Sequence, residues 1–168
     1  MFHWEIKDFG KQSSITGKAF EDGEQILCII LKNTKNNEMI RFDLLESESS
    51  EWVQAEETLI LGKWARVYKE EAKPLSQEER RHSAESFFFS LYDSNEASGE
   101  QEELGLLKYL FAVSLERKRV LKSEPIHGEA DSQIFIHAKT KRVFDVPVVI
   151  PNVESVSKVE ATLGDLLL

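Results

Sequence analysis

The sequence predicts an α+β fold, in which antiparallel sheet packs against a helical pair and a C-terminal helix. Three observations support this prediction: a strand-like pattern in the first seventy residues, helical spacing in the middle, and a second hairpin before a final amphipathic stretch. Strands and helices grouped in separate runs are typical of α+β folds. With 168 residues, the chain fits a single domain (1–168), or two lobes that comprise a β-rich part (1–73) and a helix-helix-hairpin-helix part (74–168).

The N-terminal β region is predicted from a pair of neighbouring apolar runs. Gln25–Lys32 is rich in Ile, whereas Met39–Leu45 alternates apolar and charged residues, and an Asn-rich loop separates the two. This pattern predicts a hairpin whose first strand is buried and whose second strand has one solvated face. Further strands are expected at Trp64–Lys69 and at Phe2–Ile6.

Two helices are predicted to follow Pro74. Ser76 and Glu79 have the spacing of a capping box, in which each side chain satisfies an amide of the first turn. The apolar residues of the first helix recur at helical spacing and are Ala84, Phe87, Phe88 and Leu91. The second helix is expected over residues 100–122, with an apolar stripe wide enough to be buried against two layers.

The last third of the chain predicts a second hairpin and a final helix. Gln133–Ala138 and Val143–Val149 flank the polar turn formed by residues 139–142, and Pro147 should lie at a sheet edge or strand end because it cannot donate a backbone hydrogen bond. Asn152 is expected to cap a helix whose apolar positions include Val156, Val159, Leu163 and Leu167.

Several classes of function lack their usual sequence features. Cys28 is the only cysteine, so neither an intramolecular disulfide nor a thiolate metal cluster can form. The four histidines show no metal-ligand spacing, and the glycines form no phosphate-binding motif. The N-terminus does not have the pattern of a signal peptide, and no apolar run is long enough to span a bilayer. We therefore expect a cytoplasmic protein with no cofactor, no metal and no membrane partner.

Charge is unevenly distributed along this acidic chain, whose net charge is −9. Residues 43–57 contain six acids and no base, whereas residues 106–122 contain five bases and one acid. These segments could attract each other within the fold or face different partners. The candidate anion-binding residues lie in the basic segments 117–122 and 139–142, and they are Arg117, Lys118, Arg119, Lys139, Lys141 and Arg142. If the first three lie in the last turns of a helix, their positive charges interact favourably with the negative end of the helix dipole, but their side chains point in different directions.

Other ionisable residues offer less specific chemistry. Cys28 lies within an apolar strand, where burial makes a thiol inert, and His137 is interpreted as a structural residue with satisfied hydrogen bonds. Asp43 and Asp145 could act as acid or base only if burial shifted their pKa values. No catalytic residue is assigned from these patterns.

Three short blocks together resemble a known family. They are Trp4 with residues 14–24, then Arg41-Phe42-Asp43, and finally residues 107–121. The arrangement is similar to that of an uncharacterised bacterial protein family known mainly from the planctomycete–verrucomicrobial group. Some relatives carry a Cys just before the Thr-Gly step, where this chain has Ile15, so no thiol or metal role carries over. The resemblance implies a bacterial cytoplasmic protein and no known activity.

Three hypotheses for the function follow. The first is a non-catalytic interaction module that docks a protein partner or a second copy of itself through a sheet face or the acidic segment; it requires an exposed apolar or charged patch. The second is nucleic-acid or anion binding, which the net charge disfavours and which requires the two basic segments to form one surface. The third is an enzyme of unrecognised type, which requires at least two of Asp43, His137, Asp145 and Cys28 within hydrogen-bond reach in a concave site.

Overall fold

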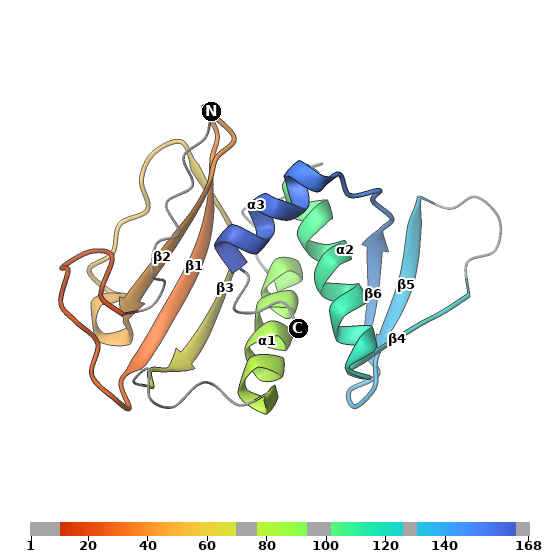
Figure 1. The fold of residues 1–168 in the computed structure, drawn as a ribbon, viewed down its shortest axis with the longest axis horizontal. Coiled ribbons are helices and arrows are strands. Elements are labelled where there is room, and N and C mark those ends of the chain that lie inside the picture. Colours follow the sequence, from red (N-terminus) through yellow and green to blue (C-terminus); the bar gives the residue numbers. More distant parts are fainter. Residues whose placement is uncertain (1–10, 70–76, 94–101, 126–130, 164–168) are drawn as a thin grey trace.

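Two three-stranded antiparallel sheets enclose a pair of helices, as Figure 1 shows. The computed structural model describes residues 11–69, 77–93, 102–125 and 131–163. The strand orders are β2-β1-β3 and β4-β5-β6, and α1 and α2 form the layer between the sheets. This arrangement confirms the predicted α+β class with its antiparallel sheet, helical pair and C-terminal helix.

The first sheet contains β1 (Gln25–Asn33), β2 (Met39–Leu45) and β3 (Thr58–Val67). The predicted hairpin is confirmed, since β1 and β2 pair in antiparallel register from Ile26↔Leu45 to Lys32↔Met39. The third strand begins well before the predicted Trp64. A short 3-10 helix, η1 (Glu46–Glu48), follows β2.

Both faces of the first sheet bury apolar side chains. Ile26, Cys28 and Ile30 of β1 face the helical layer and belong to the main core. The alternate residues Ile29 and Leu31 form a smaller cluster on the outer face, because successive side chains of a strand point to opposite faces. Burial on both faces explains why β1 is an almost continuous apolar run.

The helical layer consists of α1 (Gln77–Asp93) and α2 (Glu102–Arg117). The predicted stripe of α1 is buried, and its Phe87 ring contacts Trp64 of β3 and Phe111 of α2 at centroid distances of 5.3 and 4.9 Å. Helix α2 packs against α1 on one side and against β4 and β6 on the other. Burial against two layers, as the wide stripe predicts, is therefore confirmed.

The predicted C-terminal end of the second helix, at residue 122, was wrong. Helix α2 ends at Arg117, and the amides of Arg119 and Val120 donate to the carbonyls of Glu116 and Leu115, both at 2.9 Å. These two bonds form a Schellman cap, with Arg119 in the left-handed conformation at φ 61°. Because the cap uses Arg where Gly is usual, the sequence carried no stop signal.

The second sheet contains β4 (Leu121–Ser123), β5 (Ser132–His137) and β6 (Val143–Pro147). The predicted second hairpin is confirmed by the β5–β6 pairing. Pro147 is the last residue of the edge strand β6, as its missing N–H requires. Strand β4 occupies residues that the prediction assigned to the end of the second helix.

The final helix, α3 (Val153–Leu163), begins at the predicted cap. The amide of Ser155 donates to the Asn152 side-chain oxygen at 2.7 Å. Near its other end, the Thr162 carbonyl accepts a hydrogen bond from the Arg41 guanidinium at 3.0 Å. Since Val159 and Leu163 share the main core with residues of both sheets, α3 is held by apolar packing and by a buried cation.

Some predictions concern residues outside those that the structure describes. They are the strand at Phe2–Ile6, the cap at Ser76 and the apolar position Leu167.

Candidate functional site

The second sheet brings the two predicted basic segments together. Leu121 of β4 pairs with His137 of β5, and one residue further on the Ala138 amide donates to the Val120 carbonyl at 2.9 Å. This pairing brings the turn that contains Lys139 next to the segment that contains Arg119, although the two are far apart in the sequence. The two segments therefore form one continuous stretch of surface.

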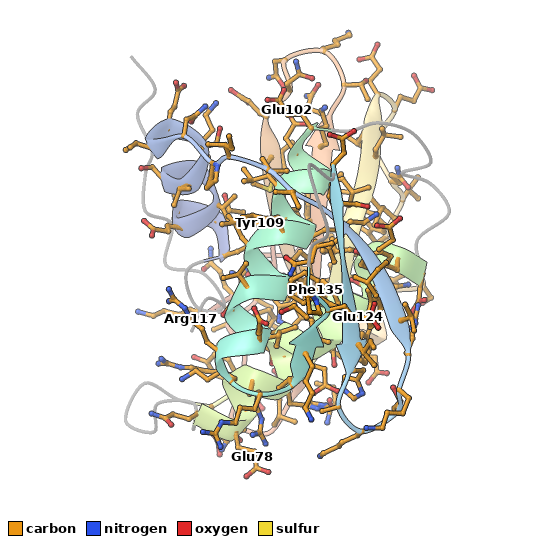
Figure 2. All side chains as sticks on the ribbon, turned by 90° about the vertical axis from the view of Figure 1, so that its right-hand side faces the viewer. Glu78, Glu102, Tyr109, Arg117, Glu124 and Phe135 are labelled. Carbon is orange, nitrogen blue, oxygen red and sulfur yellow. The ribbon has the colours of Figure 1, made fainter. Side chains whose placement is uncertain are left out.

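Four of the six predicted residues are exposed cations without a bonding partner. The side chains of Arg117, Lys118, Arg119 and Lys139 form neither an ion pair nor a hydrogen bond with any residue that the structure describes. Arg117 lies at the C-terminal end of α2, as Figure 2 shows. The expectation that Arg117, Lys118 and Arg119 point in different directions assumed a helix over all three. That assumption does not hold, since α2 ends at Arg117.

The other two predicted cations make contacts within the protein. The Arg142 guanidinium pairs with Asp93 at 2.7 Å and lies over the Phe144 ring at 4.9 Å. The Lys141 ammonium donates to the Ala138 carbonyl at 3.0 Å, closing the β5–β6 turn. Arg142 therefore joins α1 to β6, and we assign it a structural role.

Two further cations extend the cluster. Lys122 of β4 is exposed and unpaired within the described chain, and Arg81 of α1 lines an open pocket of about 360 Å³ together with Lys118. Glu78 and Gln77 line the same pocket, so the pocket itself is not purely cationic. Sequence reasoning missed Arg81, because only the packing of α1 on α2 brings it to the pocket that Lys118 lines. We define the basic surface by the residues Arg81, Arg117, Lys118, Arg119, Lys122 and Lys139.

An apolar strip borders the basic surface. Lys122, Ile136 and Val143 form one row across the three strands, on the face opposite to the buried Phe135 and Phe144. Val143 is 60 % exposed, and Ile136 of the central strand is half-buried. Cations beside exposed aliphatic side chains can bind a ligand that is both anionic and apolar.

The acidic segment lies far from this surface. In Figure 1, η1 and the connection from β2 to β3 lie at one end of the long axis, and the second sheet lies at the other. No ion pair joins residues 43–57 to residues 106–122 among the described parts of the chain. The two charged segments therefore face different directions.

Cys28 and Asp43 are the predicted catalytic candidates that do meet. They are directly opposed in the β1–β2 register, on the buried face of the sheet. Burial, followed by the charge of Asp43, raises the pKa of the Cys28 thiol to about 12. Asp43 also pairs with Arg41 at 3.2 Å. The thiol is thus protonated and inaccessible, and because both side chains are buried, no substrate can reach this pair in the folded protein.

His137 is buried in a complete hydrogen-bond network. Its Nδ1 accepts the Thr140 amide at 3.0 Å, so its Nε2 carries the proton and donates to the Glu85 carboxylate at 2.9 Å. Both ring nitrogens of His137 therefore have hydrogen-bond partners. The network joins α1 to the β5–β6 turn, in agreement with the interpretation of His137 as a structural residue.

Lys108 and Asp145 do not extend the basic surface. The Lys108 ammonium lies over the Tyr92 ring at 4.3 Å, and burial lowers the pKa of Lys108 while the charge of Asp145 opposes that shift. Burial also raises the pKa of the Tyr92 phenol, with a smaller contribution from Asp145. The Tyr92 hydroxyl donates to the backbone carbonyl of Asp145 at 3.0 Å. These contacts fix the packing of α1, α2 and β6.

Comparison with known proteins adds no relative. No family model, curated protein or solved structure matches this chain. The resemblance to the planctomycete–verrucomicrobial family therefore stays a prediction. Within the described residues, no group of His, Cys, Asp and Glu could hold a metal ion, and no helix there has the length and apolar character to cross a membrane.

Proposed function

We propose that this protein is a non-catalytic interaction module that binds an acidic protein segment through its basic surface. The observation that carries the proposal is the β4–β5 register, which places exposed cations from two distant segments side by side. We also propose that the protein is cytoplasmic and bacterial. The location is inferred from the sequence patterns described above, and the bacterial source from the resemblance to a bacterial family.

The apolar strip favours a protein ligand over a nucleic acid. Ile136 and Val143 can contact an apolar side chain that lies between two carboxylates of an acidic protein segment. Non-specific binding of a nucleic-acid strand, in contrast, typically uses aromatic side chains on which bases stack. The net charge of −9 also repels a long polyanion, because its field extends over about 10 Å at 0.1 M salt. A short acidic segment can bind the basic surface alone, whereas a long polyanion would also lie along the negatively charged parts of the protein.

The test is a binding titration with two fluorescent probes. One probe is a peptide in which Glu alternates with Val, and the other is a thymidine oligonucleotide of similar charge; the readout is fluorescence anisotropy at low salt. We expect the peptide to bind in the micromolar range and to lose at least about tenfold in affinity when Lys122→Glu and Lys139→Glu are combined. Lys18→Glu combined with Lys63→Glu, both exposed and outside the basic surface, controls for the same change in net charge.

Two results would overturn the proposal. One is a peptide affinity that the double substitution leaves unchanged. The other is tighter binding of the oligonucleotide at the same surface, which would assign nucleic-acid binding instead.

A further inference from the structure

Building on the proposed function, we infer that the acidic segment bound by the basic surface is supplied by a second copy of this chain. The segment is the acidic loop, which we define as residues 46–57, between β2 and β3. The inference rests on the charge, the apolar content and the direction of this loop.

The acidic loop presents carboxylates that the fold does not use. Glu46, Glu51 and Glu56 are exposed and have no ion pair with any described residue. The other two acids of the loop are engaged: Glu48 accepts hydrogen bonds from the hydroxyls of Ser13 and Thr16, and Glu57 pairs with Lys35 at 2.8 Å. Three free carboxylates thus match the free cations of the basic surface.

The loop also presents an apolar side chain among these carboxylates. Val53 is 85 % exposed, while the neighbouring Trp52 ring packs on Phe42 of β2 at a centroid distance of 6.3 Å. Trp52 anchors the loop on the outer face of the first sheet, so Val53 points away from its own core. A carboxylate–aliphatic pattern of this kind complements the cations and the exposed Val143 of the other sheet.

The two complementary surfaces cannot satisfy each other within one molecule. Figure 1 shows the acidic loop and the second sheet at opposite ends of the long axis, with the helical layer between the two sheets. A contact between them therefore joins different molecules end to end. Because such a contact uses different surfaces on the two copies, it is heterologous and leaves one surface of each kind open for further growth.

The charges determine how this association responds to conditions. Attraction between exposed charges is screened by salt, and the Debye length falls from about 30 Å at 0.01 M to about 3 Å at 1 M ionic strength. At about 0.1 M salt the Debye length is about 10 Å, so the overall repulsion between two copies of net charge −9 is screened while charges in contact still attract. Association should therefore be concentration-dependent at about 0.1 M salt and absent at about 1 M salt. A purely apolar contact would instead persist or strengthen at high salt.

The experiment uses two neutralised variants of the full chain in sedimentation velocity. The basic variant combines Lys118→Gln, Lys122→Gln and Lys139→Gln, and the acidic-loop variant combines Glu46→Gln, Glu51→Gln and Glu56→Gln. A control for the second variant combines Glu38→Gln, Glu102→Gln and Glu160→Gln, which removes three exposed acids elsewhere. Thermal unfolding of each variant verifies that the fold is retained.

We expect the wild type to associate at about 0.1 M salt and each neutralised variant to associate at least about tenfold more weakly. An equimolar mixture of the two variants should form a 1:1 dimer that does not grow, because only one complementary pair of surfaces remains. The control should behave as the wild type does.

A monomeric wild type at all concentrations, or variants that associate as the wild type does, would overturn the inference. So would a mixture that stays monomeric while the wild type associates. If the Glu-Val peptide still binds the basic surface in that case, the proposed function stands and only the identity of the partner is wrong.

Discussion

Gly62 of β3 offers the most direct test of how the helical layer sits on the first sheet. A Cβ at this position would lie 2.6 Å from Phe87 Cε2 and 2.9 Å from Leu91 Cδ2. To reach the 3.4 Å edge of ordinary contact, the Phe87 ring must move by about 0.8 Å. Phe87 is fully buried between Trp64 and Phe111, so the ring has no free space to enter.

The free-energy change of Gly62→Ala combines two opposing effects. Overpacking a close-packed core costs about 1–3 kcal/mol, while removing a glycine from the unfolded chain stabilises by about 0.4–1 kcal/mol. The Cβ also crowds Ser90 Oγ at 3.0 Å, which accepts the Lys63 amide at 2.9 Å. We expect Gly62→Ala to lower the free energy of unfolding by about 1–2 kcal/mol.

Gly105→Ala is the matched control. A Cβ at Gly105 of α2 meets its nearest neighbour, Pro147 Cγ, at 3.5 Å, which is ordinary contact. Alanine also favours a helix over glycine by about 1 kcal/mol, so this variant should be more stable than the wild type. Urea denaturation of both variants gives the comparison. If Gly62→Ala is as stable as Gly105→Ala, the result contradicts the close contact between α1 and β3 at Gly62.

Two further predictions concern buried polar groups. Arg41→Met removes the ion pair of the buried Asp43 and the hydrogen-bond donor of the Thr162 carbonyl, so it should lower the free energy of unfolding by about 3–5 kcal/mol in a denaturant titration. Arg41→Lys should lower it by less. A loss below about 1 kcal/mol for Arg41→Met would contradict the burial of this pair. The pKa of Cys28 is raised to about 12 in the folded state, above an unfolded value of about 8.5. The protonated thiol therefore contributes stability that is complete below about pH 8.5 and is lost as the pH rises toward 12. Denaturant titrations from pH 8 to 10 should show a fall in the free energy of unfolding that is less steep for Cys28→Ala than for the wild type. The thiol of native Cys28 should also resist a thiol reagent until the protein unfolds, and rapid labelling of the native protein would refute its burial.

The sequence predicted those elements whose signals are local. Alternation and turn residues located both hairpins, and Asn152 marked the start of α3. The C-terminal end of α2 was missed because Arg119 adopts the left-handed conformation without being Gly or Asn. Its cap depends on packing of the following residues, Val120 and Leu121, into the core, and the local sequence does not encode that packing.

The candidate site was predictable only in part, for the same reason. Clusters of Lys and Arg are visible in the sequence, but which of them stay free depends on tertiary neighbours. Asp93 pairs with Arg142, whereas the β4–β5 pairing, which the sequence did not predict, brings the turn that contains Lys139 next to the segment that contains Arg119. Arg81 joined the site through helix packing alone.

The most direct test of the central claim is an amide chemical-shift titration of the isotopically labelled protein with the Glu-Val peptide. We expect the shifts to be confined to the end of α2, β4, the central strand β5 and the β5–β6 turn, and to disappear at high salt. Shifts confined to the first sheet, or the absence of any shift at millimolar peptide, would contradict the assignment of the basic surface as the binding site.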